Sequence, residues 1–321
     1  MKRVLVVALV ALLPVLTRVP ISLGGATDAT TPGPTQAPAV VAQPSTRLML
    51  PSVARDGLPS EVTVSKASVY QAGALQVRVT RARSGTATVF GRVSTLVPEG
   101  DGLVGYVGIG IDDPPYSADI KLAFTTNEGT QESRDQWISI LKTAWTVDYI
   151  ILPPPDPNAP PPPPGLVDEQ PRLNAIYRTV TPRQWTDGWV APLTGPLYVT
   201  SYFGEQRSFD GGPVQGHHGG TDLGADFGTP IYATNNGTVV LCEQVLERGN
   251  LVVLDHGGGV FSAYGHMSSF AVTNGQTVTK GQVIGYIGST GVSTGPHLHW
   301  EIAVDGFAVD GLRWIDGSQG F

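Results

Sequence analysis

The stretch "GPHLHWEI", residues 295–302, contains two histidines one residue apart, His297 and His299. Side chains alternate across an extended strand, so His297, His299 and Glu301 would share one face while the apolar residues between them share the other. The apolar face would pack in a core, and the two imidazoles would point into the same space. A His-x-His pattern alone is weak evidence for a metal site, because surface strands often contain one, and it needs partners elsewhere in the chain.

A second histidine-containing stretch, "GHHGGTDLGADFGTP" at residues 216–230, supplies those partners. His218 and Asp222 are four residues apart, which on a straight strand puts their Cα atoms about 13 Å from each other, too far to share an ion. Gly219 and Gly220 allow the chain to bend sharply between them. We therefore expect His218 and Asp222 to approach the same ion as one histidine of the first stretch.

Three protein ligands with one open position are typical of a catalytic zinc site, whereas structural zinc sites are usually closed by four ligands. The stretch "YGHMS" places His266 where another strand could reach the same cleft. All six histidines of the chain fall between residues 217 and 299, and the single cysteine, Cys242, can form neither a cysteine-rich zinc site nor an intramolecular disulfide. The residues therefore predict a catalytic zinc site.

The composition favours an all-β protein. The chain has 321 residues, enough for two domains, and its 40 glycines and 27 prolines suit many strands joined by tight turns better than long helices. The formal net charge is -7 with no long basic run, which argues against a nucleic-acid partner held through its phosphates. We expect a monomer.

The N-terminus predicts export from the cytoplasm. "MKR" precedes the apolar run "VLVVALVALLPVL", and small residues follow, so residues 1–26 are interpreted as a signal peptide cleaved after Ala26. The run is shorter than the roughly 20 residues of a membrane span. Arg18 lies between the run and the cleavage site, which leaves an uncleaved membrane anchor as the alternative. The protein is expected to be secreted or to act in the cell envelope.

Residues 27–61 are rich in Thr, Pro, Ala and Ser and are interpreted as a flexible spacer. From residue 62 the pattern changes: "ALQVRVT" alternates apolar and polar residues, and "ATVFGRV", "GYVGIGI", "ADIKLAF" and "DQWISILK" are further strand candidates. Turn residues separate them at intervals typical of an immunoglobulin-like β-sandwich. Residues 62–152 contain no histidine, so we expect an accessory module for binding or spacing.

A proline-rich linker is expected over residues 153–184, with nine prolines between positions 153 and 164 and a short helix near residues 173–177. Such a tract favours extended polyproline conformation and acts as a semi-rigid spacer. Few contacts should cross this boundary, so a fragment beginning at Arg183 is expected to fold alone. Residues 185–321 form the second predicted domain.

The sequence pattern of the second domain also predicts strands joined by turns. Asn236 and Gly237 stand between two apolar runs, which predicts a tight β-hairpin at that dipeptide. Over about residues 200–315 the sequence resembles the lysostaphin-type, LytM-like family of zinc metallopeptidases. Three motifs carry the resemblance: His-x-Gly-x-Asp at 218–222, Tyr-x-His at 264–266, and His-x-His at 297–299.

The resemblance implies an antiparallel β domain with a narrow groove that hydrolyses peptide bonds in peptidoglycan, in stem or cross-bridge peptides. It implies that His218, Asp222 and His299 bind Zn²⁺, and that His266 and His297 flank the metal as catalytic residues. How His266 and His297 divide proton transfer and oxyanion stabilisation stays open. The alternative is a non-catalytic wall-binding or regulatory protein on the same fold, but such relatives usually lose metal ligands and this chain keeps them all.

Five further polar residues are weaker candidates. Tyr202 is a candidate for stabilising the oxyanion, and Glu301 either orients a histidine or lies on a solvated strand face. His217 should point away from the metal by strand alternation. His256 either hydrogen-bonds in a turn, which its glycine-rich setting favours, or lines the groove, and Asp226 lies past the bend and fits turn chemistry.

Overall fold

The computed structural model describes residues 59–151, 168–185 and 188–318. The expected signal peptide, nearly all of the spacer and the proline tract lie outside the described residues. Within the described ranges, no helix combines the length and the apolar character needed to cross a membrane.

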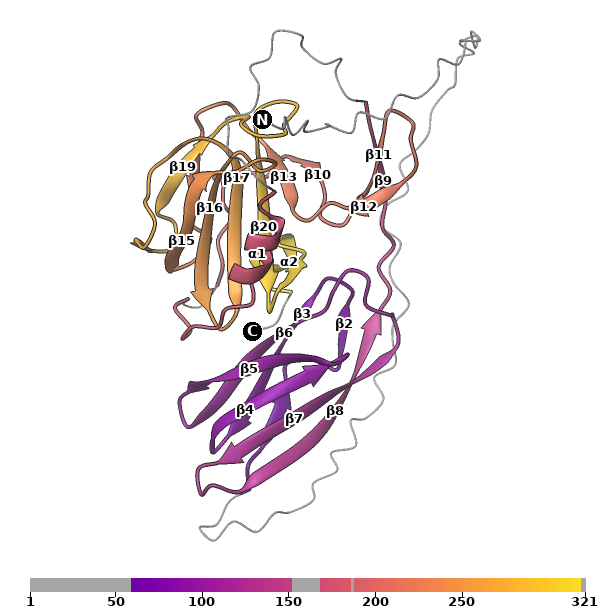
Figure 1. Cartoon of the computed structure of the whole chain (residues 1–321), viewed down its shortest axis with the longest axis vertical. Helices are drawn as coiled ribbons and strands as arrows, with labels where there is room; N and C mark the ends of the chain where they lie inside the picture. The colour runs from indigo at the N-terminus through magenta and orange to yellow at the C-terminus, as the bar shows by residue number, and fades with distance from the viewer. Residues whose placement is uncertain (1–58, 152–167, 186–187, 319–321) are drawn as a thin grey trace, which may run out of the picture. The chain divides into compact units, whose positions relative to one another are not determined.

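Eight strands of the N-terminal half form one sheet in the order β1-β3-β6-β5-β4-β7-β8-β2 (Figure 1). Neighbouring strands are antiparallel except for β2, which runs parallel to β8. The strands are β1 (Val62–Val64), β2 (Ser68–Tyr70), β3 (Ala74–Thr80), β4 (Ala82–Val89), β5 (Arg92–Glu99), β6 (Gly102–Gly108), β7 (Ser117–Thr126) and β8 (Gln131–Leu141).

The alternating stretch "ALQVRVT" is β3, and its Leu75, Val77 and Val79 side chains are fully buried in the core of this sheet. The prediction of one strand over residues 87–93 is wrong. β4 ends at Val89 and β5 begins at Arg92, because Phe90 and Gly91 adopt left-handed conformations with φ of 50° and 76° and form a tight hairpin turn.

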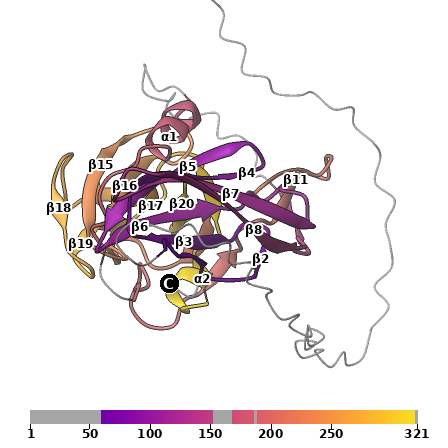
Figure 2. The same cartoon turned by 90° about the horizontal axis from the view of Figure 1, so that it is seen from below.

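The second sheet contains ten strands and carries the candidate site. Its main path is β10-β13-β20-β17-β16-β15-β18; β19 pairs with β14 and β17, and β21 pairs with β20. β15, β16, β17 and β20 lie side by side in Figures 1 and 2. The strands are β10 (Val199–Ser201), β13 (Thr221–Gly224), β14 (Pro230–Tyr232), β15 (Gly237–Gln244), β16 (Asn250–Gly257), β17 (Val260–Phe270), β18 (Thr277–Val278), β19 (Val283–Ile287), β20 (His297–Val304) and β21 (Phe307–Val309).

The predicted hairpin at Asn236 and Gly237 is wrong. β14 pairs with β19, and β15, which begins at Gly237, pairs with β16 and β18, so the two strands around the dipeptide belong to different pairs. Gly237 serves a different purpose: a Cβ at this position would lie 2.8 Å from the carbonyl oxygen of Asp255. The glycine therefore permits close approach of two backbones rather than a turn.

Both faces of the central strands are covered. On β16, Leu251 packs in a cluster with Leu173 of helix α1 (Gln170–Ile176), whereas Val252 packs in the opposite cluster with Trp300. Because β20 lies between β13 and β17 in this covered sheet, seven of its eight residues are buried, among them Glu301. The alternative that Glu301 lies on a solvated face is therefore wrong.

Contacts cross the proline-rich segment, contrary to expectation. Ala74, Val104 and Tyr106 of the first sheet belong to the same hydrophobic cluster as Trp185 and the core of the second sheet. The rings of Tyr106 and Trp185 have centroids 4.8 Å apart. Residues 168–185, which the sequence placed in the linker, pack against the second sheet instead. Apolar side chains on both sides of the linker are buried together, which a composition-based boundary does not reveal.

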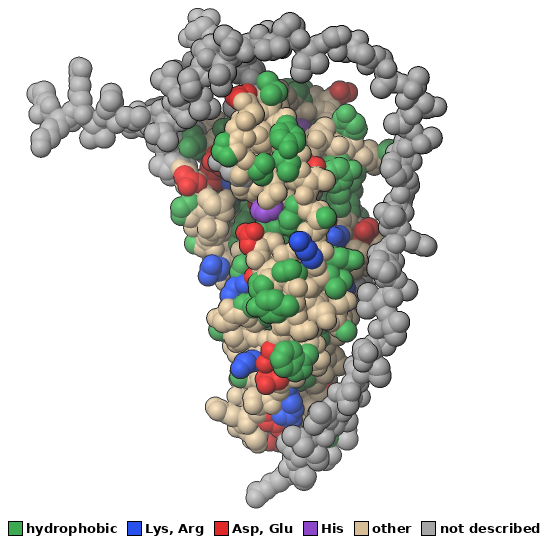
Figure 3. All heavy atoms as spheres, turned by 90° about the vertical axis from the view of Figure 1, so that its right-hand side faces the viewer, with side chains coloured by type: hydrophobic (Ala, Val, Ile, Leu, Met, Phe, Trp, Pro, Cys, Tyr) green, Lys and Arg blue, Asp and Glu red, His purple; other side chains and the backbone are tan. Residues whose placement is uncertain are grey.

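A small third sheet leads into the site. β11 (Gln206–Phe209) forms a hairpin with β12 (Gln215–His217), and β9 (Val147–Ile150) pairs parallel with the other edge of β11. A short helix, α2 (Leu312–Ile315), ends the described fold. Among the described side chains on the face seen in Figure 3, acidic and basic groups are scattered rather than gathered in one patch.

Candidate metal centre

Strand pairing brings the two motif-bearing stretches together. β20 pairs with β13 so that Asp222 stands directly opposite His299, and on its other side β17 places Gly265 opposite the same histidine. His218 follows β12, and the chain bends at Gly220 before β13 begins. Neither Gly219 nor Gly220 has a positive φ. Glycine is needed at position 220 because there is no room for a side chain: a Cβ there would lie 2.8 Å from His299 Cε1 and 2.7 Å from the carbonyl oxygen of Trp300.

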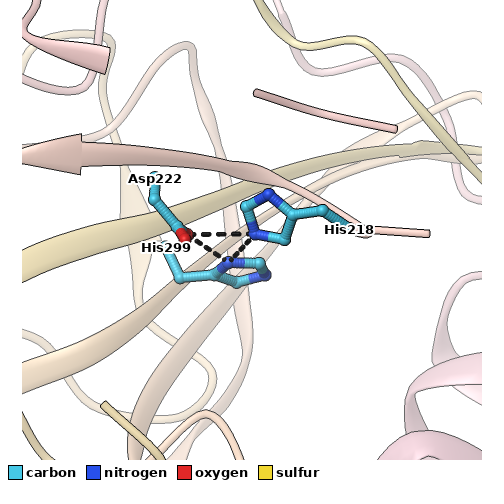
Figure 4. Close-up of side chains that lie close together, drawn as sticks. All are labelled: His218, Asp222 and His299. Carbon is cyan, nitrogen blue, oxygen red and sulfur yellow. Dashed lines mark hydrogen bonds and ion pairs between the residues drawn. The ribbon is translucent and has the colours of Figure 1, made fainter. Parts of the chain in front are cut away.

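Three potential ligand atoms converge (Figure 4). His218 Nε2 lies 3.1 Å from Asp222 Oδ1, His299 Nδ1 lies 2.7 Å from the same oxygen, and the two histidine nitrogens are 3.0 Å apart. All three residues are buried or nearly so. They are the three residues that the sequence resemblance assigned to the metal.

The imidazole of His218 is oriented by the backbone. Its Nδ1 lies 3.0 Å from the carbonyl oxygen of Tyr202, which can only accept, so Nδ1 carries the hydrogen and the Nε2 lone pair faces Asp222 and His299. Burial lowers the pKa of His218, although the negative charge of Asp222 opposes the change. His218 is therefore held as a neutral imidazole with a free nitrogen in the site.

His299 lies between two carboxylates. Its Nδ1 faces Asp222, and its Nε2 lies 2.9 Å from Glu301 Oε1. Burial disfavours the charged imidazole, but the hydrogen bonds to Asp222 and Glu301 outweigh it and raise the pKa of His299 to about 9 in the metal-free protein. Burial would raise the pKa of Asp222, but its contacts with His218 and His299 hold that pKa well below its usual range. The site without metal thus holds a proton where a cation would bind.

The three residues fit a zinc ion. Ligand atoms about 2.0–2.1 Å from a tetrahedral zinc lie about 3.3 Å from one another. The observed separations of 2.7–3.1 Å approach this value, so small side-chain shifts would suffice. Two imidazole nitrogens and one carboxylate oxygen form a donor set that zinc commonly takes, with one position left for water or substrate.

Two further histidines border the three ligands. His266 Nδ1 donates to the carbonyl oxygen of Thr290 at 2.7 Å, and His297 Nδ1 donates to that of Gly295 at 2.9 Å. Each histidine therefore keeps its Nε2 atom for other partners, and that of His297 is 3.8 Å from Asp222 Oδ1. Burial lowers the pKa of His266 to about 4. With ring centroids 4.7 Å apart, the pair offers two acid–base groups beside the candidate metal.

The weaker candidates lie elsewhere or act differently. His217 Nδ1 donates to the carbonyl oxygen of Gly204 and its Nε2 is 3.6 Å from Asp112, so it points away from the site. His256 is fully buried beside Trp189. Tyr202 contributes its backbone carbonyl to the orientation of His218.

Sequence reasoning missed two arginines. Arg207, on the hairpin before His218, lies 3.4 Å from Asp222 Oδ2. Arg248, in the turn between β15 and β16, donates from Nε to Glu301 Oε1 at 2.5 Å. Neither residue belongs to a motif, and both are brought to the site by tertiary packing, so the sequence carried no signal for them.

A buried β-sheet site of two histidines and one aspartate, with two more histidines beside it, defines a candidate metallopeptidase. Residues 216–311, which contain all five residues, match peptidase family M23. The chain therefore contains a peptidase M23 domain at these residues.

Similar proteins agree with this assignment. The peptidoglycan DD-endopeptidase ShyA of Vibrio cholerae is 37% identical over 38% of this chain and 28% of its own length, and ShyB of the same organism is 36% identical over 36% and 27%. The chain thus matches only about a quarter of the length of these curated relatives. A crystal structure of a Pseudomonas aeruginosa protein assigned to peptidase M23 is 25% identical, with a TM-score of 0.55 over 78% of this chain and 95% of that one.

Proposed function

We propose that this protein is a zinc-dependent endopeptidase that hydrolyses peptide bonds in bacterial peptidoglycan outside the cytoplasm. The observation that carries the proposal is the convergence of His218, Asp222 and His299 within 3.1 Å of one another, with the free nitrogens of two more histidines beside them. The names of the M23 relatives support peptidoglycan as the substrate class.

In this proposal one zinc ion supplies, when bound, polarisation of the scissile carbonyl and an acidified water. His218, Asp222 and His299 are its ligands. The Nε2 atoms of His266 and His297 accept the proton of the attacking water, stabilise the developing charge and return the proton to the leaving amine. Both imidazoles suit this work, because their Nδ1 atoms are anchored by backbone carbonyls and their rings cannot turn freely.

We further propose that the first sheet, within residues 62–152, is an immunoglobulin-like accessory module, and that the catalytic domain begins near residue 168 rather than at 185. Eight strands around one continuous core support the module, and the packing of Leu173 and Tyr177 against the second sheet supports the earlier boundary. The chain is proposed to act as a secreted or envelope-bound monomer.

Metal removal tests the proposed function. The purified chain should contain about one zinc and release peptide fragments from purified peptidoglycan, because three ligands leave one position for the reacting groups. A chelator should abolish release, and added zinc should restore it. Mass spectrometry of the fragments identifies the bond that is cut. Undiminished cleavage by fully metal-free protein would refute the proposal.

A further inference from the structure

A line of charged side chains runs from the candidate metal ligands to the start of helix α1. His299 Nε2 lies 2.9 Å from Glu301 Oε1, Arg248 Nε donates to the same oxygen at 2.5 Å, and Arg248 Nη1 donates to Glu169 Oε1 at 3.1 Å. Glu169 immediately precedes α1 and lies outside the segment that matches the family. Two side chains, those of Glu301 and Arg248, thus connect the ligand His299 to a residue 130 positions earlier in the chain.

This line is buried. The side chains of Glu169 and Glu301 are 2% and 3% exposed, and that of Arg248 is 13% exposed. One guanidinium therefore balances two carboxylates with little help from water. Removing one member of such a group leaves the charge of the others uncompensated, which is strongly unfavourable. Each charged side chain of this line therefore depends on its partners to remain buried.

Glu301 decides which nitrogen of His299 is free for a metal. A carboxylate can only accept, so Glu301 keeps a hydrogen on Nε2 and leaves Nδ1, which faces Asp222 Oδ1 and His218 Nε2, as the nitrogen that would bind a metal. Arg248 donates to the same oxygen, and the hydroxyl of Tyr177 donates to the other carboxylate oxygen at 3.2 Å. The carboxylate of Glu301 is consequently held from both sides.

The backbone of Arg248 reaches the other side of the site. Its carbonyl oxygen accepts from the amide of His266 at 2.7 Å, and His266 has the unusual φ of 59°. Left-handed conformations of non-glycine residues persist only where their surroundings hold them. Glu169 also binds this turn, because its carboxylate accepts hydrogen bonds from the backbone amides of Glu247 and Arg248 at 3.2 and 3.0 Å. A single carboxylate therefore anchors the turn that contacts Glu301 and His266.

We propose that Glu169 is a positioning residue of the metal site, acting through Arg248 on Glu301 and His299. The inference rests on the proposed function, because it takes the three-residue cluster to be a zinc site. The metal affinity of the catalytic domain would then depend on Glu169, which lies at the start of α1 and does not contact the metal.

The test uses the full chain with Glu169→Gln, and Glu243→Gln as the matched control. Glu243 on β15 pairs with Arg172 of the same helix, but this pair is exposed and leads away from the site. Zinc affinity is measured by competition with a chelator. The absorption spectrum of the Co²⁺-substituted protein reports the geometry of the metal site, and kcat and KM describe peptide cleavage. We expect Glu169→Gln to lower zinc affinity and kcat about 10- to 100-fold, to alter the cobalt spectrum and to leave KM nearly unchanged. The control should match wild type.

A double-mutant cycle separates positioning from general stabilisation. In an Arg248→Met background, Glu169→Gln should cause little further loss of zinc affinity, because its route to Glu301 is already broken. Should Glu169→Gln fold poorly, Glu169→Asp keeps the charge and should show a smaller loss in the same direction.

Three outcomes would overturn the inference. One is a lower melting temperature with unchanged zinc affinity and cobalt spectrum, which would make Glu169 a purely structural residue. Another is that Glu169→Gln lowers zinc affinity as much in the Arg248→Met background as it does in the wild-type chain. The third is a wild-type chain that takes up no zinc, which would remove the proposed function as well. A wild-type chain that binds zinc but cleaves no peptidoglycan would refute only the proposed function, since the affinity measurements still judge Glu169.

Discussion

At the scale of single residues, the two histidines of the "HLH" motif have different surroundings. His299 is buried between Asp222 and Glu301, whereas His297 is anchored by the carbonyl of Gly295 and keeps its Nε2 atom at the edge of the site. One residue of separation along a strand normally puts both side chains on one face with similar roles. The difference here comes from their partners, since His299 meets β13 and a carboxylate of its own strand whereas His297 meets the segment just before β20.

The first prediction separates these two histidines. His299→Ala removes one of three proposed ligands and should lose zinc and activity together, with part of the stability that metal binding contributes. His297→Ala keeps all three ligands, so it should retain about one zinc while turnover falls by roughly 10²- to 10⁴-fold. Metal analysis and kinetics of the purified variants measure both effects. A metal-free His297→Ala beside a zinc-loaded His299→Ala would reverse the assignment.

A second residue-scale prediction concerns acid stability and His256, which is not part of the site. Burial lowers the pKa of His256 to about 4, although its hydrogen bond to the carbonyl of Asn236 favours the charged form. The unfolded chain takes up this proton near pH 6.5, so the free energy of unfolding should decrease as the pH falls from about 6.5 to about 4. The expected loss is about 3 kcal/mol from this group.

Denaturant unfolding of the metal-free protein across that range measures the loss. His256→Asn can still donate to the carbonyl of Asn236 but does not titrate, so its stability should fall less steeply than that of wild type. The comparison is needed because the low pKa of His266 contributes in the same direction. Parallel curves for the two proteins would show that His256 does not couple folding to pH.

At the scale of elements, the site depends on how closely β13 and β20 approach at the bend after His218. Gly220 lies against the ring of His299 and the backbone of Trp300, whereas a Cβ at the neighbouring Gly219 would meet nothing within 4 Å. Two adjacent glycines thus look equivalent in the sequence and differ completely in the fold.

The third prediction uses this pair of glycines. Gly220→Ala should destabilise the protein by about 1–3 kcal/mol, the usual cost of overpacking, and should lower zinc affinity because the new methyl group displaces His299. Gly219→Ala is the matched control and should change neither quantity appreciably. Thermal unfolding and zinc titration of both variants provide the measurement. Equal effects of the two substitutions would mean that the bend, and not the close contact, requires glycine.

At the scale of the whole molecule, the segment after the proline tract packs with the sheet that carries the candidate site. Leu173 and Tyr177 are buried against the second sheet, and Trp185 lies in a cluster that also includes Tyr106 of the first sheet. A domain boundary drawn at Arg183 would separate Leu173 and Tyr177 from the sheet against which they pack.

The fourth prediction is an order of stability among three proteins. The full chain should be the most stable, a fragment of residues 168–321 less so, and a fragment of residues 183–321 the least. The last step removes Leu173 and Tyr177 and should cost about 3–6 kcal/mol, from about 1.5–3 kcal/mol for each large buried side chain. Thermal unfolding measures the order. If the shortest fragment melts at the temperature of the full chain, the original boundary near 185 is correct.

The sequence alone determined the strand-rich class and the five histidine and aspartate residues of the candidate site. These depend on local alternation and on short motifs, which are readable because side-chain chemistry and spacing are properties of the chain itself. Tertiary structure decided everything that depends on which strands pair. It placed Asp222 opposite His299, buried Glu301, and separated β14 from β15 despite the Asn236–Gly237 signal. It also brought Glu169 and Arg248 to the site across 79 residues, because a buried charge must find its partner wherever the fold provides one.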